Sequence, residues 1–214
     1  MDMITNLKRI KKEAIFLGCG SSINQLDEKY LQDKDIWASN CFFLHKTIVP
    51  HFYHMEMKEH RSGPTTRKVL EEKKELFKDV NWILNKERRY LLNAVKPEWF
   101  KNIYTYWPHD VRVQCVASIT IILQIMARLQ YEKIYFCGVD LNDSRYFWTD
   151  DPSYDVPAII NSCKPDERDV NDVHSTQERN VAEWIGEFLK INNIEGINLA
   201  PNSLLKKYLK TINE

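Results

Sequence analysis

Ala14-Ile15-Phe16-Leu17-Gly18-Cys19-Gly20-Ser21-Ser22 is the stretch that decides the fold, because a short apolar run ends there at a Gly-x-Gly-Ser-Ser turn. Glycines after a buried strand free the backbone torsions of the turn. Its N–H groups and the hydroxyls of Ser21 and Ser22 can then approach a phosphate or a ribose closely. The stretch therefore predicts a nucleotide site, with an ordinary tight turn as the alternative.

Short apolar runs rich in β-forming residues recur along the chain between polar stretches with helical spacing. This alternation predicts an α/β fold, a doubly wound and mostly parallel sheet with helices on both faces. The clearest helix spans about residues 117–129 and leads into the strongest strand, which ends at Gly138, Val139 and Asp140. Open α/β sheets bind ligands at such carboxyl ends. The expected strands are residues 14–17, 36–39, 51–54, 82–84, 103–106, 134–137 and 197–199.

The 214 residues are expected to form one domain. Residues 1–140 and 174–214 would make up the nucleotide-binding α/β domain. Residues 141–173, rich in Asn, Asp and Pro with interleaved aromatic residues, would be a lid inserted over the active site. After the lid we expect an amphipathic helix with Ser175 or Thr176 as its N-cap. Residues 65–78 are expected to form a solvated helix, and Pro201-Asn202-Ser203-Leu204-Leu205 to start a short terminal one.

Composition excludes several classes of function. Thirty basic and thirty acidic residues cancel, so nucleic acid is not an expected partner. No apolar run is long enough for a signal peptide or a membrane-spanning helix. The cysteines lack CxxC spacing and indicate reduced thiols in a cytoplasmic protein; they are Cys19, Cys41, Cys115, Cys137 and Cys163.

Histidines offer the clearest candidates for proton transfer. His174 follows an acidic run at the expected junction between lid and helix, where it could act as a general base. A plain helix-start histidine is the alternative reading. His51, His54 and His60 invite a metal site, but residues three apart on a strand point to opposite faces and no partner has zinc-like spacing. No metal is therefore expected.

Other candidates gather at one edge of the predicted sheet. Ser22, Asn40, Gly138 and Asp140 all follow predicted strands, and the carboxyl ends of parallel strands share an edge. Ser118 lies at the start of the long apolar helix, where unpaired N–H groups favour a phosphate, with an ordinary cap as the alternative. Tyr146 and its aromatic neighbours could cover a bound nucleotide or pack as a satellite cluster.

Together these residues resemble the bacterial sialyltransferases that use CMP-sialic acid, typified by the Campylobacter lipooligosaccharide enzymes (glycosyltransferase family 42). The similarity extends over most of the chain and keeps the family's order. Gly18-Cys19-Gly20-Ser21-Ser22 is similar to the family's Gly-Asn-Gly-Pro-Ser, Ala38-Ser39-Asn40 to its Cys-Asn, Phe52-Tyr53-His54 to its Phe-Tyr-Asn, Ser118 to its helix-start serine, residues 131–140 to its Gly-Tyr-Lys-Glu-Ile-Tyr-Leu-Ser-Gly-Ile-Asp, His174-Ser175 to its Gly-His-Ser, and residues 201–205 to its Pro-Asn-Ser-Leu-Leu.

The resemblance implies a Rossmann-like, GT-A-like fold and a metal-independent, inverting transfer of a sugar from a CMP-sugar donor to a glycan or lipooligosaccharide acceptor. His174 would deprotonate the acceptor, and Tyr146 would donate to the leaving phosphate. No cofactor is implied, since the CMP-sugar is a substrate. The family also suggests a homo-oligomer. The implied nucleotide-binding residues are Gly18, Cys19, Gly20, Ser21, Ser22, Asn40, His54, Ser118, Gly138, Val139, Asp140 and Asn142.

Departures from the family pattern leave the donor open. Cys19 and His54 replace asparagines, and Asn142 stands where the family has a second phosphate-binding tyrosine. CMP-sialic acid, another CMP-nonulosonate and CMP-Kdo all remain candidates. The sequence ends at Glu214, soon after the Pro-Asn-Ser motif, without the longer segment that the family associates with membrane contact. A cytoplasmic location is expected, with peripheral contact at the inner membrane as the alternative.

Two other functions remain open. The Gly-x-Gly-x-Ser loop is also similar to that of archaeal-type 6-hydroxymethylpterin diphosphokinases, which implies diphosphate transfer from ATP. A non-catalytic nucleotide-binding module is the second alternative, with Cys19, His54 and Asn142 marking lost active-site groups. Magnesium dependence distinguishes the first, because triphosphate chemistry normally needs a cation. CMP binding without turnover distinguishes the second.

Overall fold

A computed structural model describes residues 2–56, 63–111, 117–143, 145–154, 156–157 and 180–212. Across these residues, nine parallel strands form one sheet in the order β1-β6-β5-β4-β3-β2-β7-β8-β9. The order runs both ways from β2, so the predicted doubly wound α/β sheet is confirmed, with its switch point between β2 and β7. The strands are β1 Asp2–Met3, β2 Glu13–Leu17, β3 Asp35–Ser39, β4 Phe52–Met55, β5 Asn81–Asn85, β6 Asn102–Tyr106, β7 Lys133–Cys137, β8 Glu195–Asn198 and β9 Lys210–Thr211.

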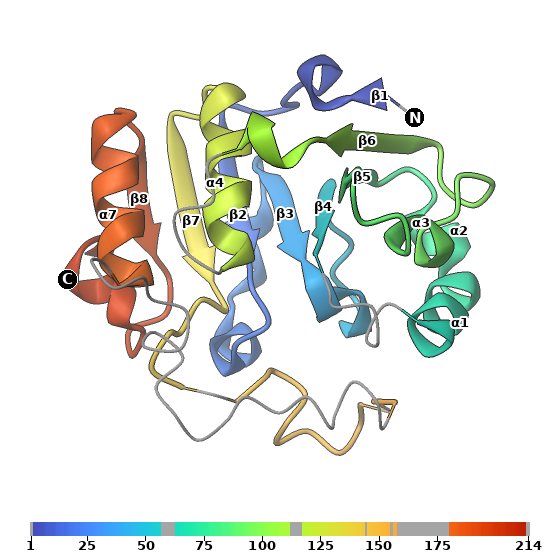
Figure 1. Ribbon diagram of the computed structural model, residues 1–214. Coiled ribbons are helices and arrows are strands. Elements are labelled where there is room, and N and C mark those ends of the chain that lie inside the picture. Colours follow the sequence, from blue (N-terminus) through green and yellow to red (C-terminus); the bar gives the residue numbers. More distant parts are fainter. Residues whose placement is uncertain are drawn as a thin grey trace.

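Helices cover both faces of this sheet (Figure 1). Helices α4 and α7 lie over β2, β7 and β8 on the face turned toward the viewer, while α1, α2 and α3 gather beside β4 and β5. The α-helices are α1 Pro64–Glu72, α2 Lys74–Phe77, α3 Leu91–Ala94, α4 Ser118–Arg128 and α7 Val181–Ile191. The 3-10 helices are η1 Ile4–Asn6, η2 Ser21–Gln25, η3 Glu28–Leu31, η4 Asn40–Leu44, η5 Pro108–Asp110 and η6 Leu204–Lys207.

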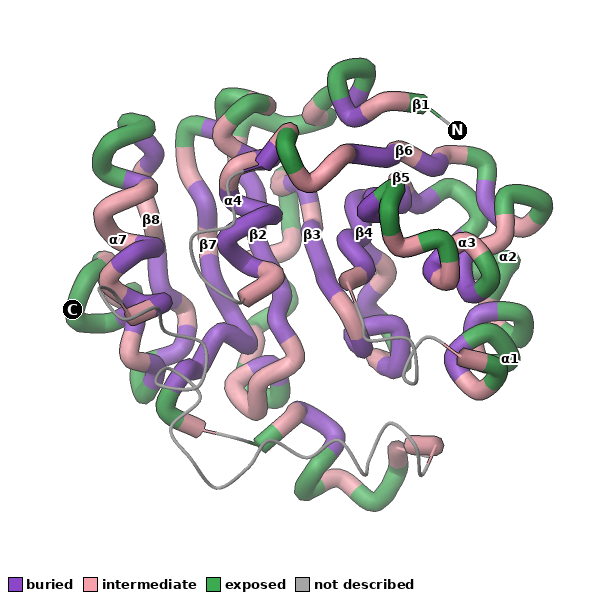
Figure 2. Tube along the Cα trace, in the orientation of Figure 1, coloured by how far each residue is buried: buried purple, intermediate pink, exposed green. Residues whose placement is uncertain are grey.

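Alternating side chains of the central strands feed two apolar cores. Phe16 of β2 packs in one cluster with Ile122 of α4, while Leu17 belongs to the other cluster, with Phe42 and Leu70. Neighbouring residues of a strand point to opposite faces, so a strand buried on both sides is apolar throughout. Figure 2 shows the result, with buried strands at the centre and exposed outer faces of the helices.

The structure corrects two expectations. Residues 65–78 do not form one solvated helix, because the chain breaks at Lys73 into α1 and α2, and Leu70 and Phe77 are buried in the core. Helix α7 begins at Val181, and its N-cap is Asn180, whose Oδ1 accepts a bond of 2.8 Å from the Glu183 N–H. Ser175 and Thr176, the predicted caps, lie outside the described residues. The edge strands β1 and β9 were not predicted, because two residues carry no readable periodicity.

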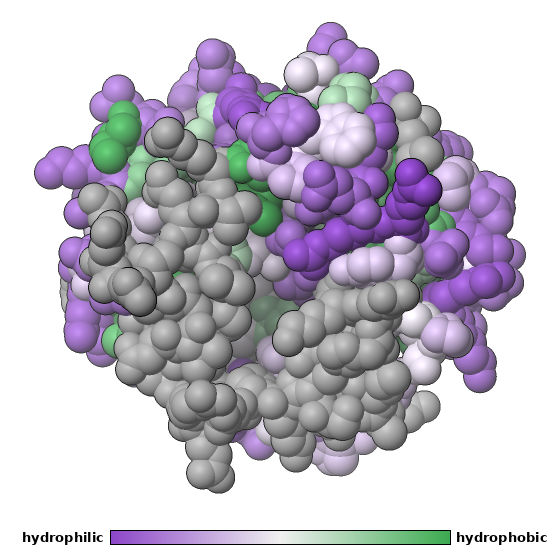
Figure 3. All heavy atoms as spheres, in the orientation of Figure 1, coloured by the Kyte–Doolittle hydropathy of each residue, from purple (hydrophilic) through white to green (hydrophobic). Residues whose placement is uncertain are grey.

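The surface of the described residues is polar in character. Figure 3 shows mostly hydrophilic side chains on the face seen there, with hydrophobic ones in small separate spots. Within the described segments, no helix is both long and apolar enough to cross a membrane. Among the described residues, Cys19, Cys41 and Cys137 form no disulfide bond, while Cys115 and Cys163 lie outside the described residues.

Candidate functional site

Two glycine segments meet backbone to backbone at the switch point. The Gly18 N–H donates to the Cys137 carbonyl (2.8 Å) and the Gly20 N–H to the Gly138 carbonyl (2.9 Å). A Cβ on Gly18 would lie 2.1 Å from the Gly138 oxygen, and Gly138 itself has a φ of 72°. Only glycine permits this approach without displacing backbone. The glycines of the quoted stretch are therefore required by the neighbouring strand end, whatever binds there.

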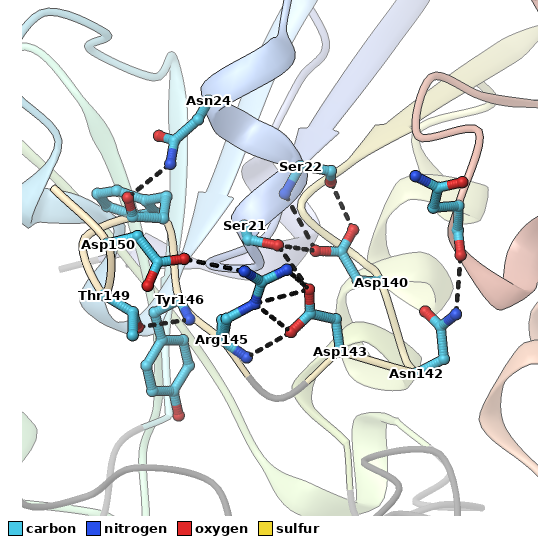
Figure 4. Close-up of polar contacts among 12 residues, drawn as sticks. Ser21, Ser22, Asn24, Asp140, Asn142, Asp143, Arg145, Tyr146, Thr149 and Asp150 are labelled. Atoms are coloured by element: carbon cyan, nitrogen blue, oxygen red, sulfur yellow. Dashed lines mark hydrogen bonds and ion pairs between the residues drawn. The ribbon is translucent and has the colours of Figure 1, made fainter.

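Asp140 collects the hydrogen-bond donors of the loop (Figure 4). The Ser22 N–H donates to its Oδ2 (3.1 Å) and the Ser22 hydroxyl to its Oδ1, while the same hydroxyl oxygen accepts from the Gly138 N–H (2.9 Å). The Ser21 hydroxyl lies 3.0 Å from Asp143 Oδ2 and 3.4 Å from Asp140 Oδ2. These donors were expected to face a phosphate. They instead hold a carboxylate of their own chain.

The charge state of this cluster follows from its surroundings. Burial raises the pKa of Asp140, against the hydrogen bonds from Ser22, which lower it. Hydrogen bonding by the Arg145 guanidinium lowers the pKa of Asp143 to about 2. Arg145 also pairs with Asp150 at 3.0 Å. The Arg145 guanidinium thus compensates part of the acidic charge of the cluster, and the carboxylate oxygens can accept hydrogen bonds from hydroxyl groups.

A pocket of about 310 Å³ opens beside this cluster. One wall is the Pro-Asn-Ser motif, because the Ser203 hydroxyl donates to the Val139 carbonyl (2.7 Å) and the Asn142 amide to the Asn202 carbonyl (2.8 Å). Sequence reasoning named Ser21, Ser22, Asp140 and Asn142 of this lining but missed its other polar residues. The Pro-Asn-Ser motif and the charged residues that follow Asp140 were the sequence features that could have identified these residues. The missed lining residues are Gln25, Asp143, Arg145, Asn202 and Ser203.

The start of the predicted lid is joined to the glycine loop by backbone pairing. Tyr146 forms an antiparallel bridge with Gly20, the Ser21 N–H donates to the Arg145 carbonyl (3.1 Å), and the Phe147 N–H donates to the Cys19 carbonyl (3.0 Å). The Tyr146 ring stacks on Trp148 with centroids 4.5 Å apart, and Figure 4 shows it directed away from Asp140. His174, the predicted base, lies outside the described residues.

Asn40 and Ser118 form a second polar group at the same edge. Asn40 has a φ of 53°, a left-handed conformation that asparagine tolerates. Its amide donates to the Ser118 hydroxyl (3.2 Å), and its Oδ1 accepts from the Glu56 N–H (3.1 Å). The structure therefore brings together two predicted residues that are 78 positions apart. Cys19 borders this group, with its Sγ 3.5 Å from the Ser39 carbonyl.

His54 is at the predicted edge but has no exposed surface. It is 0% exposed, and its Nε2 lies 2.9 Å from the Tyr106 hydroxyl. Burial, together with the nearby Arg88, lowers its pKa to about 3, so its ring is neutral. Direct contact with a nucleotide, as predicted, is not available in the described arrangement. The reason is packing, since the ring stacks against Tyr106 beneath the surface.

Among the described residues, no three His, Cys, Asp or Glu side chains lie in a group that could hold a metal ion.

Comparison with known proteins supports the fold. The sequence matches no protein-family model and no curated protein. Among solved structures, the monofunctional α-2,3-sialyltransferase Cst-I from Campylobacter jejuni has a TM-score of 0.60 at 15% identity over 95% of this chain and 81% of that one. The C. jejuni sialyltransferase CstII with the substrate analogue CMP-3FNeuAc has a TM-score of 0.58 at 18% identity, covering 94% and 86%. CST-II with a trisaccharide acceptor and CMP has a TM-score of 0.59 at 16% identity, again covering 94% and 86%. The chain therefore has the α/β fold of these sialyltransferases.

Proposed function

We propose that this protein is a glycosyltransferase that moves a sialic acid-like sugar from a CMP-sugar to a hydroxyl of an acceptor glycan. One observation carries the proposal. The polar residues of the quoted motifs lie together at the switch point of a fold shared with sialyltransferases solved with CMP and with a CMP-sugar analogue. Fold similarity alone would not support a function, because one fold hosts many.

The charges of the site suggest how the nucleotide is oriented. Asp140 would accept hydrogen bonds from nucleoside hydroxyls, as an acidic residue does in dinucleotide-binding folds, whereas Asp143 is already paired with Arg145. The phosphate would lie toward Ser118 and Asn40. Ser118 opens the 11-residue helix α4, whose N-cap residue Ala117 forms no side-chain cap bond. The N–H groups there and the helix dipole favour an anion.

The reaction itself would be an inverting displacement. His174 would take the proton of the acceptor hydroxyl as that oxygen attacks the anomeric carbon on the face opposite the phosphate. The bond between the anomeric carbon and the phosphate oxygen breaks, and CMP leaves with the electron pair. Tyr146 would donate a hydrogen bond to that phosphate after a movement of its ring. The lid predicted at residues 141–173 would limit hydrolysis of the donor by water.

The experiment is donor hydrolysis by the purified full-length protein. CMP-sialic acid, a second CMP-nonulosonate and CMP-Kdo are supplied in turn, and CMP release is measured with and without EDTA. We expect release from at least one donor, unaffected by EDTA, and a loss of at least about 100-fold in His174→Ala. His109→Ala is the matched control, since that side chain is 76% exposed and outside the site. Absence of CMP release from every donor would contradict the proposal.

A further inference from the structure

A second groove lies on the other side of residues 145–154, the segment that pairs with the glycine loop. It has a volume of about 550 Å³, within the usual range for ligand sites. Helix α1 and the end of η4 form one wall, and the segment after Asp151 forms the other. Figure 1 shows this segment running along the carboxyl edge of the sheet from β7 toward α1. The apolar lining consists of Leu44, Val69, Val156, Pro157 and the Tyr154 ring.

Lysines dominate the charge of this groove. Lys46, Lys68 and Lys73 line it, and Glu72 is the one acidic residue among its described lining residues. None of the three lysines forms an ion pair with a carboxylate of the described residues. By contrast, Lys12, Lys29, Lys78, Lys96, Lys101, Lys133 and Lys210 all do. The lining therefore carries three lysines against one glutamate, and the Asp151 carboxylate near Lys46 offsets only part of this positive charge.

Two of these lysines are held in place by neutral groups. The half-buried Lys73 ammonium donates to the carbonyls of Phe43 (2.7 Å) and His45 (3.2 Å). The Lys46 ammonium donates to the Ser153 hydroxyl and lies 4.3 Å from the centre of the Tyr154 ring. Burial, with Lys73 and Lys46 nearby, lowers the pKa of His45 to about 4, which is consistent with a positive potential. A groove with more cations than carboxylates favours an anion from outside.

The groove is coupled to the nucleotide site through one aromatic residue. Phe147, whose N–H bonds the Cys19 carbonyl in the glycine loop, packs on Phe42 (5.7 Å between ring centroids) and on Tyr154 (5.3 Å). The same segment therefore forms the border of the nucleotide site and a wall of the lysine groove. A ligand in the groove would be the neighbour of the donor across this segment.

We propose that this groove binds an anionic sugar of the acceptor, with its carboxylate or phosphate between Lys46 and Lys68 and its carbon ring against Tyr154. The positive charge selects an anionic group over a neutral sugar, and the apolar lining suits the less polar face of a sugar ring. The role as an acceptor subsite rests on the proposed glycosyltransferase function. Anion binding by itself does not depend on that function.

The test is calorimetric titration of the full-length protein with N-acetylneuraminic acid, glucose 6-phosphate and galactose. The first two separate a carboxylate from a phosphate, and galactose is the neutral control. Lys46→Glu and Lys68→Glu each reverse a charge at an exposed position. Lys74→Glu on α2 makes the same change at an exposed position outside the groove lining. CMP is titrated into every variant.

We expect at least one anionic sugar to bind, galactose not to bind, and the affinity for the anionic sugar to fall at least tenfold in Lys46→Glu and Lys68→Glu but not in Lys74→Glu. CMP affinity should be equal in all variants. Three results would overturn the proposal: neither anionic sugar binds, galactose binds as tightly as they do, or Lys74→Glu loses as much affinity for the anionic sugar as the groove variants do. In each case, CMP binding would still support the donor site. Groove binding without any binding of CMP would overturn the acceptor role.

Discussion

Replacement of Asp140 separates its structural contribution from its contribution to ligand binding. In Asp140→Ala, the Ser22 N–H and hydroxyl lose their acceptors, whereas Ser21 keeps Asp143 at 3.0 Å. In Asp140→Asn, the side chain keeps its shape and one carbonyl oxygen, and its amide can donate to Ser22. The two variants therefore remove the same charge but differ in the hydrogen bonds that they leave.

The magnitude follows from the two bonds to Ser22. Hydrogen bonds to a charged group contribute about 1.5–3 kcal/mol each, which gives about 3–6 kcal/mol for the pair. The raised pKa of Asp140 means that burial of its charge offsets part of this gain. We expect Asp140→Ala to lower the free energy of unfolding by about 3 kcal/mol, and Asp140→Asn to change it by less than about 1 kcal/mol.

Urea unfolding followed by tryptophan fluorescence measures the stability, and calorimetric titration measures CMP affinity. If Asp140 accepts bonds from nucleoside hydroxyls, Asp140→Asn should weaken CMP about tenfold despite its normal stability. Equal destabilisation by Asn and Ala would refute the view that hydrogen bonds to Ser22, rather than the charge, hold the loop. Unchanged CMP affinity in Asp140→Asn would refute its role in the nucleotide site.

Three further outcomes follow from the described contacts. Gly18→Ala should lower the free energy of unfolding by about 3 kcal/mol, since the new Cβ would meet the Gly138 oxygen, and a normal urea midpoint would exclude that close packing. Asn180→Ala should cost about 1 kcal/mol through loss of the α7 cap, while Asn180→Ser should be near neutral in the same assay. The pKa of Asp140 is raised in the folded protein, so its contribution to the free energy of unfolding is greatest below its ordinary pKa of 3.8 and declines as the pH rises. The wild type should therefore lose stability relative to Asp140→Asn between that pH and neutrality. A stability difference between the two proteins that does not change with pH, measured by urea unfolding, would argue against this.

For the loop after β2, the sequence predicted the position but not the hydrogen-bond partners. Its position at the sheet edge was predictable because a buried parallel strand is apolar throughout and its carboxyl end must meet those of its neighbours. The hydrogen-bond acceptor of the loop could not be predicted, because Asp140 lies 118 residues away from Ser22 along the chain. Nothing in a local pattern indicates that a carboxylate of the chain itself takes the donors that suit a phosphate.

The sequence by itself determined the alternation of the longer strands with helices and the sheet edge at which Ser22, Asn40, Gly138 and Asp140 lie. These depend on local apolar periodicity and on the geometry of parallel strands. Only the tertiary structure decided that His54 is enclosed, that Tyr146 is bridged to Gly20, and that Lys46 meets Ser153 across 107 residues to form a charged groove. Such contacts depend on how distant segments pack, and the free energy of packing is not contained in any one stretch of the chain.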